Sequence, residues 1–307
     1  NRISTNEVDV ATKKVVYTQW LNERGGIEAD LTVTRLEEDK YLIVTAGASQ
    51  VRDYCWLRDR IPVDAHATIT DITSGWAVLS VMGPLSRKLL QSLSSDDFSN
   101  SAFPFGTARN IDLGYARVLA IRITYVGELG WELYVPTEFA AGAFDVIIEN
   151  SEDYGLRLAG YHALNSLRIE KAYRHWGHDI TNEDTPIEAG LGFAAKLKKP
   201  NGFIGDEALQ KSINEPLKRR LVQFLLQDPE PMLYHEEPIW RDGIRVGRTT
   251  SGMYGHTLGG AIGLGYVEHS EGVSTEFVEN GNFEIEIAGT RHPAAASLKP
   301  MYDPLSE

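Results

Sequence analysis

The pair Gly25-Gly26, with the stretch that follows it, constrains the fold of this chain more than any other feature of the sequence. Paired glycines reach positive φ at little steric cost, so they mark a sharp turn. Residues 27–36 then alternate apolar and polar side chains. This alternation is typical of a half-buried β-strand. We therefore predict a hairpin whose second strand starts just after the glycines.

Asp30 falls near the start of this predicted strand. With Ile27, Leu31 and Val33 facing inward, the Asp30 carboxylate lies at the edge of the apolar layer and is partly desolvated, which suits a catalytic base. The alternative is that Asp30 caps the glycine turn with a side-chain oxygen. The residues alone leave both interpretations open.

Composition narrows the class of protein. A chain of 307 residues exceeds a single hydrophobic core, so we expect two or three subdomains. The net charge of -13 argues against nucleic acid as a partner, because phosphate binding needs a basic face. No apolar run reaches membrane-spanning length. Cys55 is the one cysteine, which excludes an internal disulfide and fits a reducing compartment such as the cytoplasm or the mitochondrial matrix.

The order of the predicted elements indicates an α+β fold. Helices and strands mix up to about residue 205, where we place a boundary, and from Arg220 onward the signals are strands and turns. We predict a first region at 1–205 and a β-domain at 206–307. The expected strands are 41–45, 67–72, 76–81, 116–124, 221–226, 239–246 folded about a turn at Asp242-Gly243, and 283–287. The expected helices are 48–58 with Ser49 as its cap, 84–93, 138–149 and 159–172.

Two further charged residues occupy informative positions. Gly127 and Gly130 bracket Glu128, which predicts a carboxylate on a tight turn between two strands, although a turn acid is commonly only solvated. Arg168 lies next to the Leu164 and Leu167 stripe of its predicted helix, so its guanidinium can reach a neighbouring cleft. The alternative for Arg168 is a surface ion pair with Glu149 or Glu170.

Other patterns carry less chemistry. His175, His178 and Asp179 lack the helical His-x-x-x-His pair and the cysteines of a zinc site, so we expect no metal, and we place His175 and Trp176 on a pocket wall. The basic run at Lys196, Lys198 and Lys199 predicts a solvated face, or else a surface that steers an anionic tail. No dinucleotide fingerprint and no phosphate loop are present.

Several segments resemble the aminomethyltransferase family, the glycine-cleavage T-protein fold. Residues 25–33 match its G-G-I-x-x-D-L-x-V segment. Residues 124–132 resemble its G-Y-T-G-E-x-G-x-E segment, with Val126 in place of the usual Thr, and residues 165–172 resemble its D-S-L-R-L-E-A-G segment, with Asn165 in place of Asp. The resemblance runs colinearly over nearly the whole chain. It implies a multi-subdomain folate-binding fold that ends in a β-barrel.

The same resemblance implies roles for individual residues. Asp30 corresponds to the catalytic aspartate beside the reactive nitrogens of tetrahydrofolate, and Glu128 corresponds to the acceptor for the pterin ring. A carboxylate suits the paired N–H groups of the pterin, because it accepts two parallel hydrogen bonds. Arg168, Tyr125 and Trp176 are the other expected folate contacts.

The sequence of residues 17–36 is most similar to the C-terminal portion of sarcosine and dimethylglycine dehydrogenases. In such an oxidoreductase, an upstream FAD domain oxidises an N-methyl amine to an iminium, and the folate portion captures the carbon as 5,10-methylenetetrahydrofolate. The chain opens with Asn, and the family carries further residues ahead of this point, so we expect a piece of a longer polypeptide. The flavin domain belongs to that missing part or to a partner subunit.

Two alternatives stay open. One is a stand-alone aminomethyltransferase of the glycine cleavage system, a transferase acting on a lipoyl-bound aminomethyl group. The other is a non-enzymatic member that resembles the pyruvate dehydrogenase phosphatase regulatory subunit. The sequence does not name the amine, the oligomeric state or the host.

Overall fold

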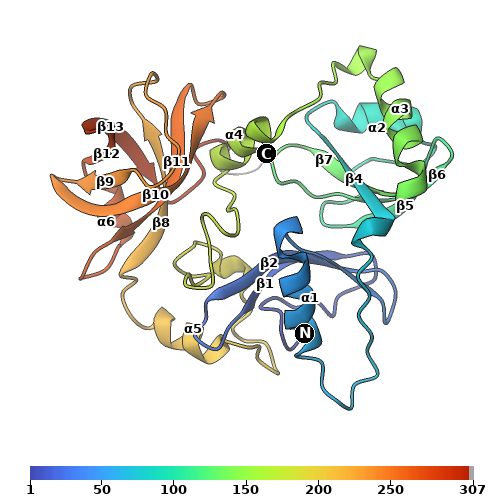
Figure 1. Cartoon of the computed structure of the whole chain (residues 1–307), viewed down its shortest axis with the longest axis horizontal. Helices are drawn as coiled ribbons and strands as arrows, with labels where there is room; N and C mark the ends of the chain where they lie inside the picture. The colour runs from blue at the N-terminus through green and yellow to red at the C-terminus, as the bar shows by residue number, and fades with distance from the viewer. Residues whose placement is uncertain (304–307) are drawn as a thin grey trace. The chain divides into compact units, whose positions relative to one another are not determined.

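Contacts divide the chain into two compact units. A computed structural model describes residues 1–303, and their path is shown in Figure 1. The barrel unit comprises Asn1–Asn6, Gln19–Asp30 and Ala159–Glu307, and the sheet unit comprises Glu7–Thr18 and Leu31–Leu158. Strands β1 (Val15–Leu21) and β2 (Ile27–Arg35) each contribute residues to both units. The sequence-based division at residues 205 and 206 rests on a different criterion and stays a prediction.

The barrel unit contains a closed six-stranded antiparallel barrel with the order β10-β11-β8-β13-β12-β9. Its core is formed by the inward residues of these strands, with Phe224, Ile239 and Phe283 among them. This confirms the predicted C-terminal β-barrel. The elements of this region are β8 (Arg219–Leu226), β9 (Pro238–Arg241), β10 (Ile244–Gly255), β11 (Gly260–Glu268), α6 (Thr275–Glu279), β12 (Phe283–Ile287) and β13 (Thr290–Ser297).

The predicted turn at Asp242-Gly243 joins β9 to β10. Both residues have positive φ, 49° and 81°, as a two-residue hairpin turn of the primed type requires. The short side chain of Asp242 suits this conformation, and its Oδ1 accepts hydrogen bonds from the backbone and side-chain N–H groups of Asn282. The strand–turn–strand prediction for 239–246 is therefore confirmed.

Helix α4 (Tyr161–Glu170) packs against the barrel, with Ile169 among Leu221, Ile262 and Leu264. The predicted stripe of Leu164 and Leu167 is wrong, because both side chains are only half-buried. The buried residues of α4 are instead Ser166, Arg168, Ile169 and Glu170, three of them polar. Polar partners on the barrel make this possible; Ser166 Oγ, for example, donates to the Tyr254 carbonyl at 2.5 Å. Helix α5 (Asp206–Ile213) precedes the first barrel strand.

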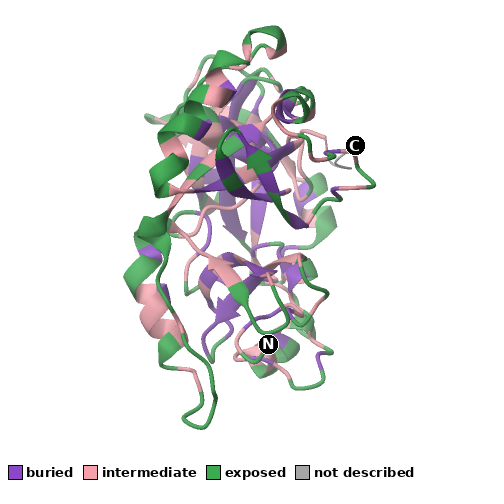
Figure 2. Ribbon diagram, turned by 90° about the vertical axis from the view of Figure 1, so that its right-hand side faces the viewer, coloured by how far each residue is buried: buried purple, intermediate pink, exposed green. Residues whose placement is uncertain are grey.

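The sheet unit is built on a four-stranded antiparallel sheet with the order β4-β7-β6-β5. Helices α2 (Ser86–Leu93) and α3 (Ala140–Glu149) share a core with one face, around Trp131 and Leu133. Alternation places Tyr134 on the other face, in a second apolar cluster. Figure 2 shows that the strands are the most buried parts. The strands are β4 (Trp76–Met82), β5 (Ala108–Leu113), β6 (Ala116–Ile121) and β7 (Gly130–Pro136).

Two local predictions for the sheet unit are wrong. Helix α1 (Gln50–Arg58) has no side-chain cap from Ser49, which is the last residue of a 3-10 turn and lacks the extended backbone of a capping residue. Residues 67–72 form no strand, because no neighbouring strand pairs with them within the described chain. The third strand of the β1-β2-β3 sheet, β3 (Tyr41–Val44), is confirmed. Within residues 1–303, no helix has both the length and the apolar character to cross a membrane.

The Gly25-Gly26 turn is confirmed, and each glycine has its own physical reason. Gly25 has a φ of 86°, in the left-handed region. Gly26 is required by close approach instead, because a Cβ there would lie 1.9 Å from the carbonyl oxygen of Asn182. The turn is thus pressed against a segment far along the chain.

We predict that Gly26→Ala destabilises the protein, because the added methyl group forces the Asn182 backbone to move. Overpacking of this kind costs about 1–3 kcal/mol in free energy of unfolding. Gly142→Ala is the matched control, since Gly142 is exposed in α3 and its added Cβ meets nothing within 4 Å. That change should stabilise by about 0.5–1 kcal/mol. Urea denaturation of both variants measures the difference, and an unchanged Gly26→Ala protein would contradict the prediction.

Candidate functional site

Asp30 is the fourth residue of β2 rather than its first. Its neighbours Ala29 and Leu31 are 3% exposed, whereas Asp30 is half-buried, so the carboxylate projects from the face opposite the apolar one. Gln19 Nε2 donates to Asp30 Oδ1 at 2.9 Å. This bond fixes one carboxylate oxygen. The result is an oriented, partly desolvated carboxylate on a regular strand.

The turn-capping alternative for Asp30 is wrong. Asn22 performs that task, because its Oδ1 accepts hydrogen bonds from the backbone N–H groups of Arg24 and Gly26, each at 3.0 Å. Asparagine is a common turn residue for this reason. Asp30 is therefore not needed to close the hairpin.

The end of the β1–β2 hairpin is held by the segment from Trp176 to Asp184. The Trp176 indole Nε1 donates to the Ile27 carbonyl at 2.9 Å, and the Ile27 N–H donates to the Asp184 carbonyl at 3.0 Å. Asn22 Nδ2 donates to the Asn182 carbonyl at 3.0 Å. Trp176, expected on a pocket wall, is half-buried and bound to the strand that carries Asp30. Its contact with folate stays a prediction.

Arg168 is 2% exposed and is bound inside the barrel unit. Its guanidinium donates to Asn165 Oδ1 at 3.1 Å, to the Tyr173 carbonyl at 3.0 Å, to Asp179 Oδ2 at 2.5 Å and to Ser251 Oγ at 2.9 Å. Four of its five N–H groups are used in this way. The surface-pair alternative is therefore wrong, and the group that faces folate in the resemblance is an internal anchor here. A folate contact by Arg168 remains a prediction.

Asp179 is the acceptor at the centre of this network, with an exposure of 0%. Its oxygens accept from Arg168, from the His175 N–H at 3.0 Å and from Thr250 Oγ1 at 2.6 Å. The rings of His175 and His178 lie 4.7 Å apart. Burial, and then the positive charges of His178 and Arg168, lower the pKa of His175, while Asp179 opposes the shift. Among residues 1–303, no cluster of three or more His, Cys, Asp or Glu side chains is placed to hold a metal ion.

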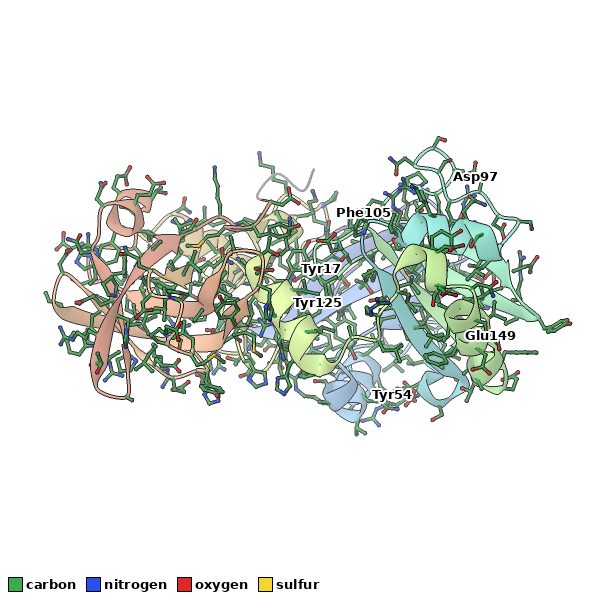
Figure 3. The ribbon with its side chains drawn as sticks, turned by 90° about the horizontal axis from the view of Figure 1, so that it is seen from above. Tyr17, Tyr54, Asp97, Phe105, Tyr125 and Glu149 are labelled. Atoms are coloured by element: carbon green, nitrogen blue, oxygen red, sulfur yellow. The ribbon has the colours of Figure 1, made fainter. Side chains whose placement is uncertain are left out.

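Glu128 and Tyr125 lie in the sheet unit, in the connection 122–129 between β6 and β7. Both side chains are half-buried. The predicted tight turn is wrong, because β6 ends at Ile121 and the chain runs through a series of bends before β7. Gly127 has a φ of 77°, as its place in a bend requires. Figure 3 labels Tyr125 and, beside it in that view, Tyr17 of β1.

A second carboxylate of residues 124–132 was assigned no role from the sequence. Glu132 lies on β7, and Tyr134 Oη donates to its Oε2 at 2.7 Å. Burial raises the pKa of Glu132, and the Tyr134 hydrogen bond only partly opposes this. Burial and the neighbouring Glu132 likewise raise the pKa of Tyr134. The signal was present in the alternation: Trp131 and Leu133 are apolar and fully buried, so Glu132 had to face the other side of a sheet that is covered on both faces.

The basic run is also different from its prediction. Lys199 is 9% exposed, and its ammonium donates to the carbonyls of Asn1, Ser4 and Asn6 at 2.5, 2.7 and 2.8 Å. Three acceptors satisfy its three N–H groups. Lys199 is thus a structural cation, and only Lys196 and Lys198 remain on an exposed face.

Comparison with protein families identifies both regions. The family described as GCVT N-terminal domain matches residues 1–199, and the glycine cleavage T-protein C-terminal barrel domain matches residues 219–303. The chain belongs to the glycine cleavage T-protein family. The predicted family and fold class are therefore confirmed.

Relatives within the T-protein family include amine-oxidising enzymes. The chain is 42% identical, over 99% of its length, to 4-methylaminobutanoate oxidase (formaldehyde-forming) of Paenarthrobacter nicotinovorans, and 38% identical, over 94%, to human mitochondrial sarcosine dehydrogenase. It spans only about a third of these relatives, 36% and 33% of their lengths. The structure of aminomethyltransferase T from Bartonella henselae superposes with a TM-score of 0.84 at 24% identity, covering 98% of this chain and 80% of that one, which shows the shared fold.

We predict that Glu132 makes the stability of the protein depend on pH. Its pKa is raised in the folded state, so the stabilising contribution of the protonated form is fully present below the ordinary value of 4.5 and is lost as pH rises through the higher folded value. Glu132→Gln should remove this loss. The melting temperature of the variant relative to that of the wild type should therefore increase as pH rises from the ordinary pKa of 4.5 through the raised pKa of Glu132. Melting curves from pH 4 to pH 8, about the range of glutamate titration when buried, measure it. A difference in melting temperature that is constant with pH would contradict the prediction.

Proposed function

We propose that this chain is the tetrahydrofolate-binding portion of an N-methyl amine dehydrogenase of the sarcosine or dimethylglycine type. In this role it is a folate-dependent one-carbon transferase, and it captures the carbon of a methylated-amine iminium as 5,10-methylenetetrahydrofolate. FAD and the oxidation step belong to an upstream domain or a partner subunit. The similarity to sarcosine dehydrogenase and to an oxidase whose name records formaldehyde formation supports this choice.

The geometry around Asp30 carries the proposal. A base for nitrogen chemistry must be within hydrogen-bond reach and only partly hydrated. Asp30 is half-buried, its Oδ1 is fixed by Gln19, and the first residue of its strand is bound through both its N–H and its C=O. Asp30 thus holds or accepts the proton that a folate nitrogen loses when it attacks. Tetrahydrofolate itself supplies the two nucleophilic nitrogens.

The family resemblance assigns pterin binding to a carboxylate that lies in the sheet unit. The pterin edge presents paired N–H donors, and Glu128 is the proposed acceptor, with Tyr125 as a further contact. Glu132 is a second carboxylate only four residues away in the chain, already oriented by Tyr134. Arg168 and Trp176 are proposed folate contacts in the barrel unit; for Arg168, the one N–H left by its internal bonds sets the limit of such a contact.

The direct test is calorimetric titration of the chain with tetrahydrofolate, together with an assay for oxidation of sarcosine and dimethylglycine. We expect binding, and we expect no amine oxidation by this chain alone. Circular dichroism establishes that the titrated protein is folded. A folded protein that does not bind tetrahydrofolate would refute the proposal and favour a regulatory member of the family.

A second test separates the residues that bind tetrahydrofolate from the residue that assists the reaction. Glu128→Ala removes the acceptor for pterin N–H groups, which should weaken tetrahydrofolate binding by about 1–3 kcal/mol. Asp30→Ala should leave affinity nearly unchanged and slow formation of 5,10-methylenetetrahydrofolate about 10²- to 10⁴-fold, the usual contribution of a general base. The rate is measured with the chain joined to its amine-oxidising flavin domain, where released formaldehyde should rise to match.

Two companion variants make this test specific. Glu132→Gln decides which carboxylate grips the pterin, because only the true acceptor should lower affinity on substitution. Asp112→Asn is the neutral control, since Asp112 forms an exposed ion pair with Arg117 at side-chain exposures of 64% and 60%. Loss of binding in Asp30→Ala with unchanged binding in Glu128→Ala would show that the two roles are reversed.

A further inference from the structure

Two buried aspartates lie in the segment from Trp176 to Asp184, which holds the end of the β1–β2 hairpin. Asp179 binds Arg168 of α4, and Asp184 binds Arg219 at the start of β8. The exposures of Asp179 and Asp184 are 0% and 3%. The proposed function assigns a task to neither of them. Their place in the barrel unit, next to Trp176, suggests one.

We propose that Asp179 is a positioning residue for the proposed folate site, which fixes Trp176 and, through Ile27, the strand that presents Asp30. The inference rests on the proposed function for the meaning of Trp176 and Asp30. Its structural part, the control of Trp176 by Asp179, rests only on contacts within the barrel unit.

The first step is the convergence on the Asp179 carboxylate. Its donors come from three separate elements: Arg168 from α4, Thr250 from β10, and the His175 N–H from the connecting segment itself. Arg168 is in turn fixed by Ser251 of β10. One carboxylate thus joins a helix, a barrel strand and a loop at a single point.

The second step is the local closure around Trp176. The Asp179 N–H donates to the His175 carbonyl at 2.9 Å while its carboxylate accepts the His175 N–H, and the Gly177 N–H donates to the Ile180 carbonyl at 2.8 Å. Trp176 lies inside this closed turn, and it forms a backbone bridge with Ile180. The direction of the indole is therefore set by the same turn that Asp179 closes.

The third step leads from the indole to β2. Trp176 Nε1 donates to the Ile27 carbonyl, and the Ile27 N–H is held by the Asp184 carbonyl. Asp30 follows three residues later on the same strand. A shift of the indole would therefore remove the hydrogen bond to the Ile27 carbonyl and loosen the start of the strand that carries Asp30, although the Asp184 carbonyl still holds the Ile27 N–H.

Energetics favour a positioning role over a stabilising one. A buried ion pair gains little net stability over apolar residues of the same volume, because desolvation offsets the attraction. A fully satisfied buried network does fix a single geometry. The network at Asp179 is of that kind, since its carboxylate oxygens accept three hydrogen bonds.

The experiment first follows the indole itself. The chain contains six tryptophans, so ¹⁵N-tryptophan labelling gives six indole N–H signals, and Trp176→Phe assigns the relevant one. Asp179→Asn places an amide N–H against Arg168 and should shift the Trp176 signal and speed its hydrogen exchange roughly tenfold or more, as expected when a protecting contact opens locally. The Asp112→Asn control should leave it unchanged. An unaltered Trp176 signal in Asp179→Asn would overturn the proposal.

The second readout is a double-mutant cycle in tetrahydrofolate affinity. Asp179→Asn and Trp176→Phe should each weaken binding roughly tenfold, and the double variant should be no weaker than the stronger single change, because neighbours in one network are not additive. Effects that multiply would show that Asp179 acts independently of Trp176, and would overturn the inference. If the wild type binds no tetrahydrofolate, the proposed function fails, while the indole signal still decides whether Asp179 positions Trp176.

Thr250→Val is the second variant in case Asp179→Asn does not fold. It removes one donor to Asp179 and leaves the ion pair with Arg168 in place. A smaller shift of the same Trp176 signal is expected. If Asp179→Asn does not fold and a folded Thr250→Val protein shows no shift of the Trp176 signal, the proposal is overturned.

Discussion

The barrel unit depends on two aspartate–arginine pairs in which both carboxylates are buried, although the Arg219 side chain is 31% exposed. Each pair joins the long connection after α4 to the barrel or to the helix packed on it: Asp179 with Arg168, and Asp184 with Arg219. The Arg219 guanidinium also lies 3.7 Å from the centre of the Tyr266 ring, so it is packed as well as paired. Without these anchors, a connection that contains no helix or strand between residues 173 and 184 would have no fixed conformation.

This irregular connection explains why the end of the β1–β2 hairpin, residues 19–30, is part of the barrel unit. The hairpin end offers backbone groups at Ile27, and the connection supplies a carbonyl and an indole N–H at the right positions to satisfy them. Because Gly26 has no Cβ, the Asn182 backbone can lie against the hairpin end. Close backbone contact thus helps to place the strand of Asp30, together with the burial of Trp20, Leu21 and Ile27.

Regular features with short-range causes could be predicted from the sequence. The glycine turn, the Asp242-Gly243 hairpin and the barrel strands follow from local rules on φ and alternation, and the structure confirms them. The predictions that were wrong depended on distant partners. Leu164 and Leu167 have the right spacing for a core stripe, but the barrel offers polar acceptors to the other side of α4. Lys199 looks like a surface lysine until the first six residues fold over its ammonium.

The same limit applies to the candidate site. The position of Asp30 on a strand after a glycine turn could be predicted from alternation. Its orientation by Gln19 and the bonds of Arg168 to Asp179 and Ser251 could not, because these partners lie 11, 11 and 83 residues away in the chain. The partial burial of Glu132 could also have been predicted, because it alternates with the buried Trp131 and Leu133. A polar residue between two buried apolar ones in a sheet covered on both faces is the pattern to look for.

The contact between Asn22 and Asn182 has a consequence for synthesis of the chain. These residues are 160 positions apart, so at about 5–20 residues per second the hairpin end waits roughly 8–30 s for its partner to leave the ribosome. The sheet unit has all its residues by Leu158 and can fold in that interval. Residues 19–30 belong to the barrel unit, so they must remain without their partners until the segment that starts at Ala159, nearly half of the chain, is made. The time spent in that state, rather than the final stability, sets the period during which a nascent chain of this protein is exposed to aggregation.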